Sequence, residues 1–162
     1  MRILGIDPGI ERCGWGIIEE KNGKINAISY GCIFTAKDLE MSKRLTELHD
    51  KLLSLLKEFL PEVVAMEDLF FNNNAKSAIV VGQARGVIMF TVGKEKIPLF
   101  SYSPLEIKMS ITGYGRAEKE QIQAMVKNIL HLKEIPKPDD TADALAVAIT
   151  HSFVNKFKSK IK

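Results

Sequence analysis

Acidic side chains end two short apolar segments that lie far apart in the sequence: Asp7 ends the first and Glu67 the second. Two further acids, Asp140 and Asp143, open a long apolar segment near the end of the chain and, being three residues apart, share one face of a helix. Carboxylates that meet at one place repel one another and raise each other's pKa unless cations are present. Oxygen ligands without cysteine suit Mg²⁺ or Mn²⁺, and such a site can hold two ions that flank the reacting oxygens of phosphoryl transfer.

Each acid also has an ordinary structural interpretation. Aspartate before Pro8-Gly9 is common in turns, Asp140 after a proline can cap a helix, and Glu67 can be an ordinary residue where a strand leaves the sheet. Asp143 is the most informative of the helix acids, because it is followed by six apolar residues and borders a helix that is apolar nearly all round. The chemical interpretation depends on an acid ending two separate strands.

The elements that must position these acids follow from periodicity. Strands are predicted at 2–7, 13–20 and 24–34, the last two joined by an Asn22-Gly23 hairpin turn, which indicates an antiparallel meander. Two more strands alternate with helices, which indicates parallel crossovers and an α/β fold: a five-stranded mixed sheet flanked by α-helices. The later strands are predicted at 63–67 and 97–102. The helices are predicted at 41–59, at 75–94, from 103 to the Gly113 loop, at 118–130 and at 140–157.

Composition sets the class of protein. The chain has 162 residues, 46% hydrophobic and 27% charged, which predicts a single soluble domain over residues 1–155, with no membrane span and a cytoplasmic location. The basic tail, residues 156–162, contains four lysines. Its charge of +4 exceeds the net charge of +3, so the other 155 residues carry −1. Nucleic-acid binding must therefore depend on local groups, and the tail is expected to be a solvated end.

The two cysteines, Cys13 and Cys32, are too few for a disulfide scaffold and lack metal-site spacing. An Asn22-Gly23 hairpin turn would place them opposite each other unless a bulge intervenes. Two reduced thiols remain the expected state.

Five blocks of sequence stand in order over residues 1 to about 155: Gly5–Gly9, Glu67 after its apolar strand, Gly82–Gly86, Thr112–Lys119 and Asp140–His151. In their order and compatible spacing, these blocks resemble the RuvC family of Holliday-junction resolvases. The resemblance implies an RNase H-like fold and an Mg²⁺-dependent endonuclease, which makes two symmetric nicks in a four-way DNA junction during recombination and repair and leaves 5′-phosphate and 3′-hydroxyl ends.

The resemblance also assigns roles to individual residues. It implies that Asp7, Glu67, Asp140 and Asp143 are catalytic ligands of two metal ions per site, Mg²⁺ or, in its place, Mn²⁺. It implies that Lys108 and Lys119 lie close to the scissile phosphate, where they can neutralise its charge. The aromatic ring of Phe70 is expected to stack on an unpaired base, and Lys76, Arg85 and Arg116 are predicted to contact phosphates. Without the resemblance, these lysines would be interpreted as solvated groups on helix faces.

The implied partners are four-way junction DNA, a second copy of the chain and a RuvA–RuvB branch-migration complex. A homodimer suits the substrate, because two identical sites can cut opposed strands. The helix at 75–94 carries the small residues Ala78, Gly82 and Gly86 at every fourth position, and the resemblance places this helix in the dimer interface. Two alternatives stay open: a related RNase H-like nuclease acting on RNA, and a non-catalytic junction-binding protein.

Overall fold

The computed structural model describes residues 1–68 and 75–160, except for the side chains of 75–77 and 157–160, and contains one five-stranded mixed sheet. The strand order is β3-β2-β1-β4-β5, with β1 antiparallel to β2 and parallel to β4. The strands are β1 (Arg2–Asp7), β2 (Arg12–Lys21), β3 (Lys24–Phe34), β4 (Val63–Glu67) and β5 (Leu99–Tyr102). The helices are α1 (Met41–Phe59), α2 (Ala75–Lys94), α3 (Pro104–Thr112), α4 (Lys119–Ile129) and α5 (Asp139–Lys160).

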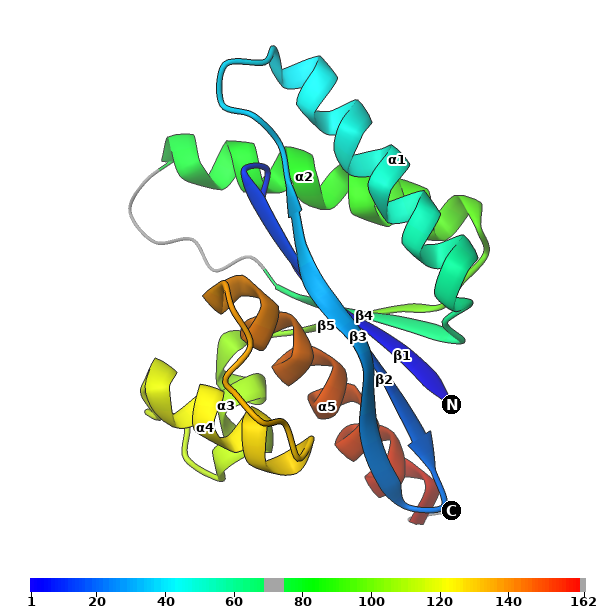
Figure 1. Cartoon of the computed structure of the whole chain (residues 1–162), viewed down its shortest axis with the longest axis vertical. Coiled ribbons are helices and arrows are strands. Elements are labelled where there is room, and N and C mark those ends of the chain that lie inside the picture. Colours follow the sequence, from blue (N-terminus) through cyan, green and yellow to red (C-terminus); the bar gives the residue numbers. More distant parts are fainter. Residues whose placement is uncertain (69–74, 161–162) are drawn as a thin grey trace.

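Helices cover both faces of the sheet. Figure 1 shows α1 and α2 on one side and α3, α4 and α5 on the other. The strands alternate accordingly: Leu4 and Ile6 of β1 join the cluster under α1 and α2, whereas Ile3 joins the cluster under α5. Because both faces of the central strands are buried, β1 and β4 are apolar up to the acid that ends each of them, apart from Arg2 at the start of β1.

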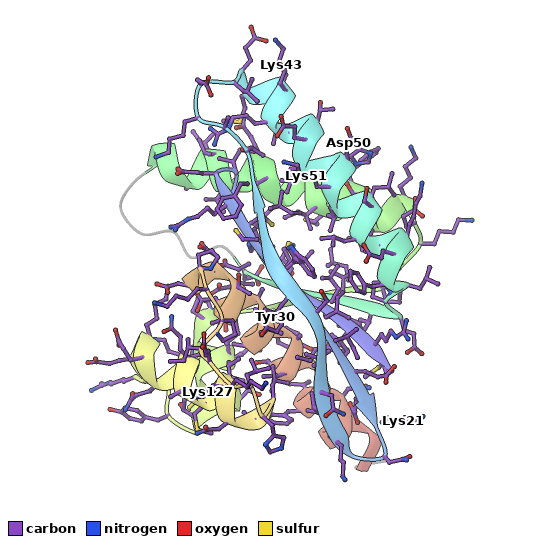
Figure 2. All side chains as sticks on the ribbon, viewed as in Figure 1. Lys21, Tyr30, Lys43, Asp50, Lys51 and Lys127 are labelled. Carbon is purple, nitrogen blue, oxygen red and sulfur yellow. The ribbon has the colours of Figure 1, made fainter. Side chains whose placement is uncertain are left out.

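Helix α1 follows the predicted amphipathic pattern. Leu48, Leu52 and Leu56 are buried against the sheet, and charged residues such as Lys43 and Asp50 lie on its outer side (Figure 2). Their spacing of four residues places the leucines in one stripe, which is why the helix packs along the sheet with a single face.

Glycines let α5 lie directly on the sheet. A Cβ atom on Gly5 of β1 would lie 2.0 Å from the main-chain oxygen of Ala144, and one on Gly14 of β2 would lie 1.9 Å from that of Asp140. No other residue type leaves room for the helix backbone at these two positions. The first turn of α5 is thereby placed against the ends of β1 and β2.

The predicted elements and fold class are confirmed, with shifts at the boundaries. Helix α5 begins at Asp139, so Asp140 lies inside the first turn, and its interpretation as a helix cap is wrong. The same helix runs past the predicted domain boundary at 155 as far as Lys160, and Lys156 pairs with Glu20 at 3.5 Å. None of the helices in the described part of the chain is long and apolar enough to cross a membrane.

The strands that carry the cysteines contain the bulge that would separate them. The pairing of β2 with β3 slips by one residue between Ile17 and Ile18, so Cys13 lies opposite Ile33 and Cys32 opposite Gly14. Both thiols are free. Burial raises the pKa of Cys13 to about 12 and that of Cys32 to about 11, which keeps them protonated and unreactive at neutral pH.

Candidate active site

The two strand-end acids lie side by side on one face of the sheet. Ile6 pairs with Met66 across the parallel strands β1 and β4, so Asp7 and Glu67 follow at equivalent positions. Side chains alternate along a strand, and because Ile6 and Met66 both point toward α1 and α2, the two acids point toward α5. The two carboxyl groups lie close enough for repulsion from Glu67 to raise the pKa of Asp7.

The start of α5 adds two more acids, and two basic side chains lie beside them. Asp143 forms an ion pair with Lys119 at 3.2 Å, and Lys119 also reaches Asp139 at 3.4 Å. The Oδ2 atom of Asp140 lies 3.3 Å from Nε of Arg12 but is buried without a hydrogen-bond partner. All four predicted acids therefore meet around the ends of β1 and β4 and the start of α5.

Burial and mutual repulsion raise the pKa values of three acids in this cluster. Burial, followed by repulsion from Glu67, Asp143 and Asp140, raises the pKa of Asp7 to about 8. Burial likewise raises the pKa of Glu67 and of Asp143, although the ammonium of Lys119 opposes the shift at Asp143. Carboxyl groups with raised pKa values become acidic again once a cation lies beside them.

A cavity of about 200 Å³ opens beside the acids. Its charged lining combines Glu67 and Asp143 with both predicted lysines, Lys108 and Lys119, so a phosphate entering the cavity would meet carboxylates and ammonium groups together. The remaining lining residues are Pro104, Ile107, Ile122 and Ala146.

The donor set fits a hard divalent cation by its chemistry. The candidate ligands are carboxylate oxygens only, one of them an unpartnered buried oxygen of Asp140. As the side chains stand within residues 1–68 and 75–160, no three His, Cys, Asp or Glu groups converge closely enough to hold an ion. A cation at this site competes with Lys119 for Asp143, since the ammonium already contacts that carboxylate.

The predicted DNA contacts are distributed unevenly. Arg116 is exposed in the loop between α3 and α4, next to the cavity lysines in sequence. The Arg85 side chain, by contrast, is only 12% exposed and contacts Glu67 and Asp68 at the end of β4. Phe70 and the side chain of Lys76 lie outside the described residues, so the predictions for them stay predictions.

Sequence analysis missed two cluster members, Arg12 and Asp139. Arg12 begins β2 three residues after the Pro8-Gly9 turn, and its place at the same sheet edge as Asp7 is the signal that could have found it. Asp139 stands directly before the predicted ligand pair and shares Lys119 with Asp143. None of the three histidines belongs to this cluster; His49 bonds Thr91, and His151 bonds Tyr102.

Comparison with known proteins identifies the family. The family model described as crossover junction endodeoxyribonuclease RuvC matches residues 3–151. The chain belongs to the RuvC family. The RuvC of Caldicellulosiruptor saccharolyticus is 55% identical over 93% of this chain and 92% of its own, and that of Clostridioides difficile is 49% identical over 100% and 96%. Thermus thermophilus RuvC, solved in complex with Holliday junction substrate, superposes with a TM-score of 0.93 at 35% identity, covering 98% of this chain and 96% of that one.

Membership in the RuvC family selects among the interpretations left open by sequence. It favours the DNA-junction endonuclease over the nuclease acting on RNA and over the non-catalytic binding protein. The RNase H-like fold expected for a RuvC protein is the fold observed.

Proposed function

We propose that this RuvC-family chain resolves Holliday junctions by metal-dependent hydrolysis at the cluster of Asp7, Glu67, Asp140 and Asp143. The observation that carries the proposal is that Asp7 and Glu67 end neighbouring parallel strands in register, with Asp140 and Asp143 beside them in one electrostatic cluster. The family is one of crossover junction endodeoxyribonucleases, and its relative from T. thermophilus is solved with junction DNA. The products are DNA ends with 5′-phosphate and 3′-hydroxyl groups.

The divalent cation is Mg²⁺, two ions per site, because the ligands are hard carboxylate oxygens and Mn²⁺ can replace Mg²⁺ at such sites. When bound, it supplies an acidified water and neutralises charge on the phosphate. Asp7, whose pKa is raised to about 8, would give up its proton to serve as a ligand, and Glu67 would be the second ligand from the strand ends. Asp140 and Asp143 complete the ligand set from α5.

The cavity lysines have a complementary task. Lys108 and Lys119 line the cavity together with Glu67 and Asp143, so an entering phosphate lies against their ammonium groups. Positive charge there stabilises the extra negative charge that develops on the phosphate during hydrolysis. Lys119 must change partners as the site loads, since it contacts Asp143 and Asp139. Phosphate contacts by Arg116 and Lys76, and stacking of Phe70 on an opened base, are proposed from the family resemblance alone.

A homodimer places two such sites on one junction, and α2 is the surface that we assign to it. Ile79 and Phe90 are each 64% exposed and Met89 is 50% exposed, an unusual amount of apolar surface for one helix. A Cβ atom added to Gly86 would meet nothing within 4 Å, so a second helix backbone can approach there.

RuvA–RuvB as motor partner and a cytoplasmic location are inferred from family membership alone. Residues 156–162 are proposed as a tail outside the nuclease domain.

Cleavage of a synthetic four-way junction tests the proposal. Wild-type protein should nick opposed strands symmetrically in Mg²⁺ or Mn²⁺ and leave ends that ligase can seal, whereas a linear duplex of the same sequence should stay intact. Glu67→Gln should bind the junction in Ca²⁺ with wild-type affinity and lose at least 1000-fold in rate. A Glu67→Gln protein that cleaves normally would remove this cluster from the mechanism.

A further inference from the structure

Arg85 joins helix α2 to the end of the catalytic strand β4. One guanidinium nitrogen donates to the main-chain oxygen of Glu67, and a second nitrogen lies 2.8 Å from Oδ1 of Asp68. The side chain of Arg85 is only 12% exposed and that of Asp68 is 47% exposed, so the bond to Glu67 is the more shielded of the two contacts. A planar guanidinium with several donors suits this double contact, because a single ammonium cannot bond both acceptors in the same geometry.

The contact holds the main chain of β4 at Glu67, the proposed metal ligand at the end of the strand. Beyond Met66, the chain passes Glu67 and Asp68 and leaves the sheet, held on the other side by a hydrogen bond from Asp68 N to Tyr102 O of 2.8 Å. Arg85 therefore holds the main chain of Glu67 from α2 while β5 holds its neighbour. The side-chain direction of Glu67 depends on this main-chain position.

We infer that Arg85 is a positioning residue, which orients Glu67 for metal binding and cleavage and does not act mainly through contact with DNA phosphate. The inference rests on the proposed function of Glu67. It differs from the phosphate-contact role predicted from the sequence, because the donors of a phosphate-binding arginine must be accessible, whereas two of these nitrogens already contact the protein. A small displacement of a ligand is sufficient to cost about 100-fold in rate.

Four variants separate the two roles. Arg85→Met removes both contacts, and Arg85→Lys keeps the charge but cannot make both. Asp68→Asn removes the ion pair and leaves the contact with Glu67 O. Lys94→Met is the matched control, because it deletes a positive charge from the exposed last turn of the same helix.

Positioning predicts a specific pattern of measurements. For Arg85→Met, the single-turnover rate on a saturated junction should fall about 100-fold, and Mn²⁺ affinity of the protein without DNA, measured by calorimetry, should fall about tenfold. Hydrogen exchange at the amide of Asp68 should accelerate. Junction affinity in Ca²⁺ and its salt dependence should stay within threefold of wild type. Arg85→Lys should be intermediate, and Asp68→Asn and Lys94→Met should stay within threefold of wild type in rate.

Other patterns would overturn the inference. Junction affinity that falls tenfold or more, with a salt slope reduced by about one and unchanged Mn²⁺ affinity, would make Arg85 a phosphate contact. Wild-type cleavage by Arg85→Met would give it no role in the reaction. If urea titration shows that Arg85→Met is not folded, Arg85→Lys takes its place in every comparison. A wild-type protein that fails to cut junctions refutes the proposed function, whereas Mn²⁺ affinity and exchange still test the contact.

Discussion

Replacing Asp7 by asparagine should stabilise the protein while abolishing cleavage. The pKa of this carboxyl rises from an ordinary 3.8 to about 8 in the folded chain, chiefly through burial and then through repulsion by Glu67, Asp143 and Asp140. Between these two pH values the folded state holds a proton that the unfolded state has released. The contribution of this proton to the free energy of unfolding is therefore fully present below about pH 4 and is lost as the pH rises toward 8.

The magnitude follows from the width of that interval. Each pH unit in which only the folded state holds the proton costs about 1.4 kcal/mol, so at pH 7 the cost is about 4 kcal/mol at most. Since Glu67 and Asp143 share the same repulsion, we expect Asp7→Asn to gain about 2–4 kcal/mol at pH 7 and much less near pH 4.5.

Urea unfolding in EDTA at pH 4.5, 6 and 7.5 measures this gain, with Asp50→Asn as the control. Asp50 is an exposed acid on α1, so its replacement removes one negative charge far from the cluster and should leave the free energy of unfolding unchanged at all three pH values. Addition of Mg²⁺ should stabilise wild-type protein more than Asp7→Asn, which has lost a ligand. A variant that is no more stable than wild type at pH 7.5, or whose gain does not grow with pH, would refute the reasoning.

Three further predictions concern the surroundings of the cluster. Lys119→Met should reduce the single-turnover cleavage rate about 100-fold while changing junction affinity less than tenfold in filter binding. Phe90→Asp should convert the dimer into monomers in analytical ultracentrifugation and uncouple the paired cuts, whereas a protein that is monomeric before substitution would remove α2 as the interface. Gly14→Ala places a methyl group on the backbone of Asp140, so urea unfolding should show a loss of about 1–3 kcal/mol. An unchanged free energy of unfolding would mean that α5 does not rest on this glycine.

Alternation and register explain why the acid cluster was predictable. Two apolar strands each end in an acid, and when such strands run parallel as neighbours their carboxyl ends lie at the same edge of the sheet. The observed pairing of Ile6 with Met66 makes Asp7 and Glu67 adjacent. The i, i+3 spacing of Asp140 and Asp143 then needed only a helix that begins at this edge.

The contacts of Arg85 could not be predicted in the same way. Its acceptor at Glu67 is a main-chain oxygen, which every residue has, so no sequence pattern distinguishes this arginine from one that binds phosphate. The bulge at Ile17/Ile18 is similar, because nothing in the local sequence marks where the ladder slips. Both features depend on how elements meet in space, and only coordinates contain that information.

The same tight packing that creates the site also brings its carboxylates close together, where they repel one another. Gly5 and Gly14 allow the backbone of α5 to touch β1 and β2, which brings Asp140 and Asp143 to the strand-end acids and buries Asp7. A bulkier residue at either glycine would hold the helix away and relieve the repulsion, at the loss of the shared ligand set. The raised pKa of Asp7 is therefore the energetic consequence of an arrangement that Lys119 offsets in part and that a bound divalent cation would stabilise further, as is typical when function and stability conflict at a site.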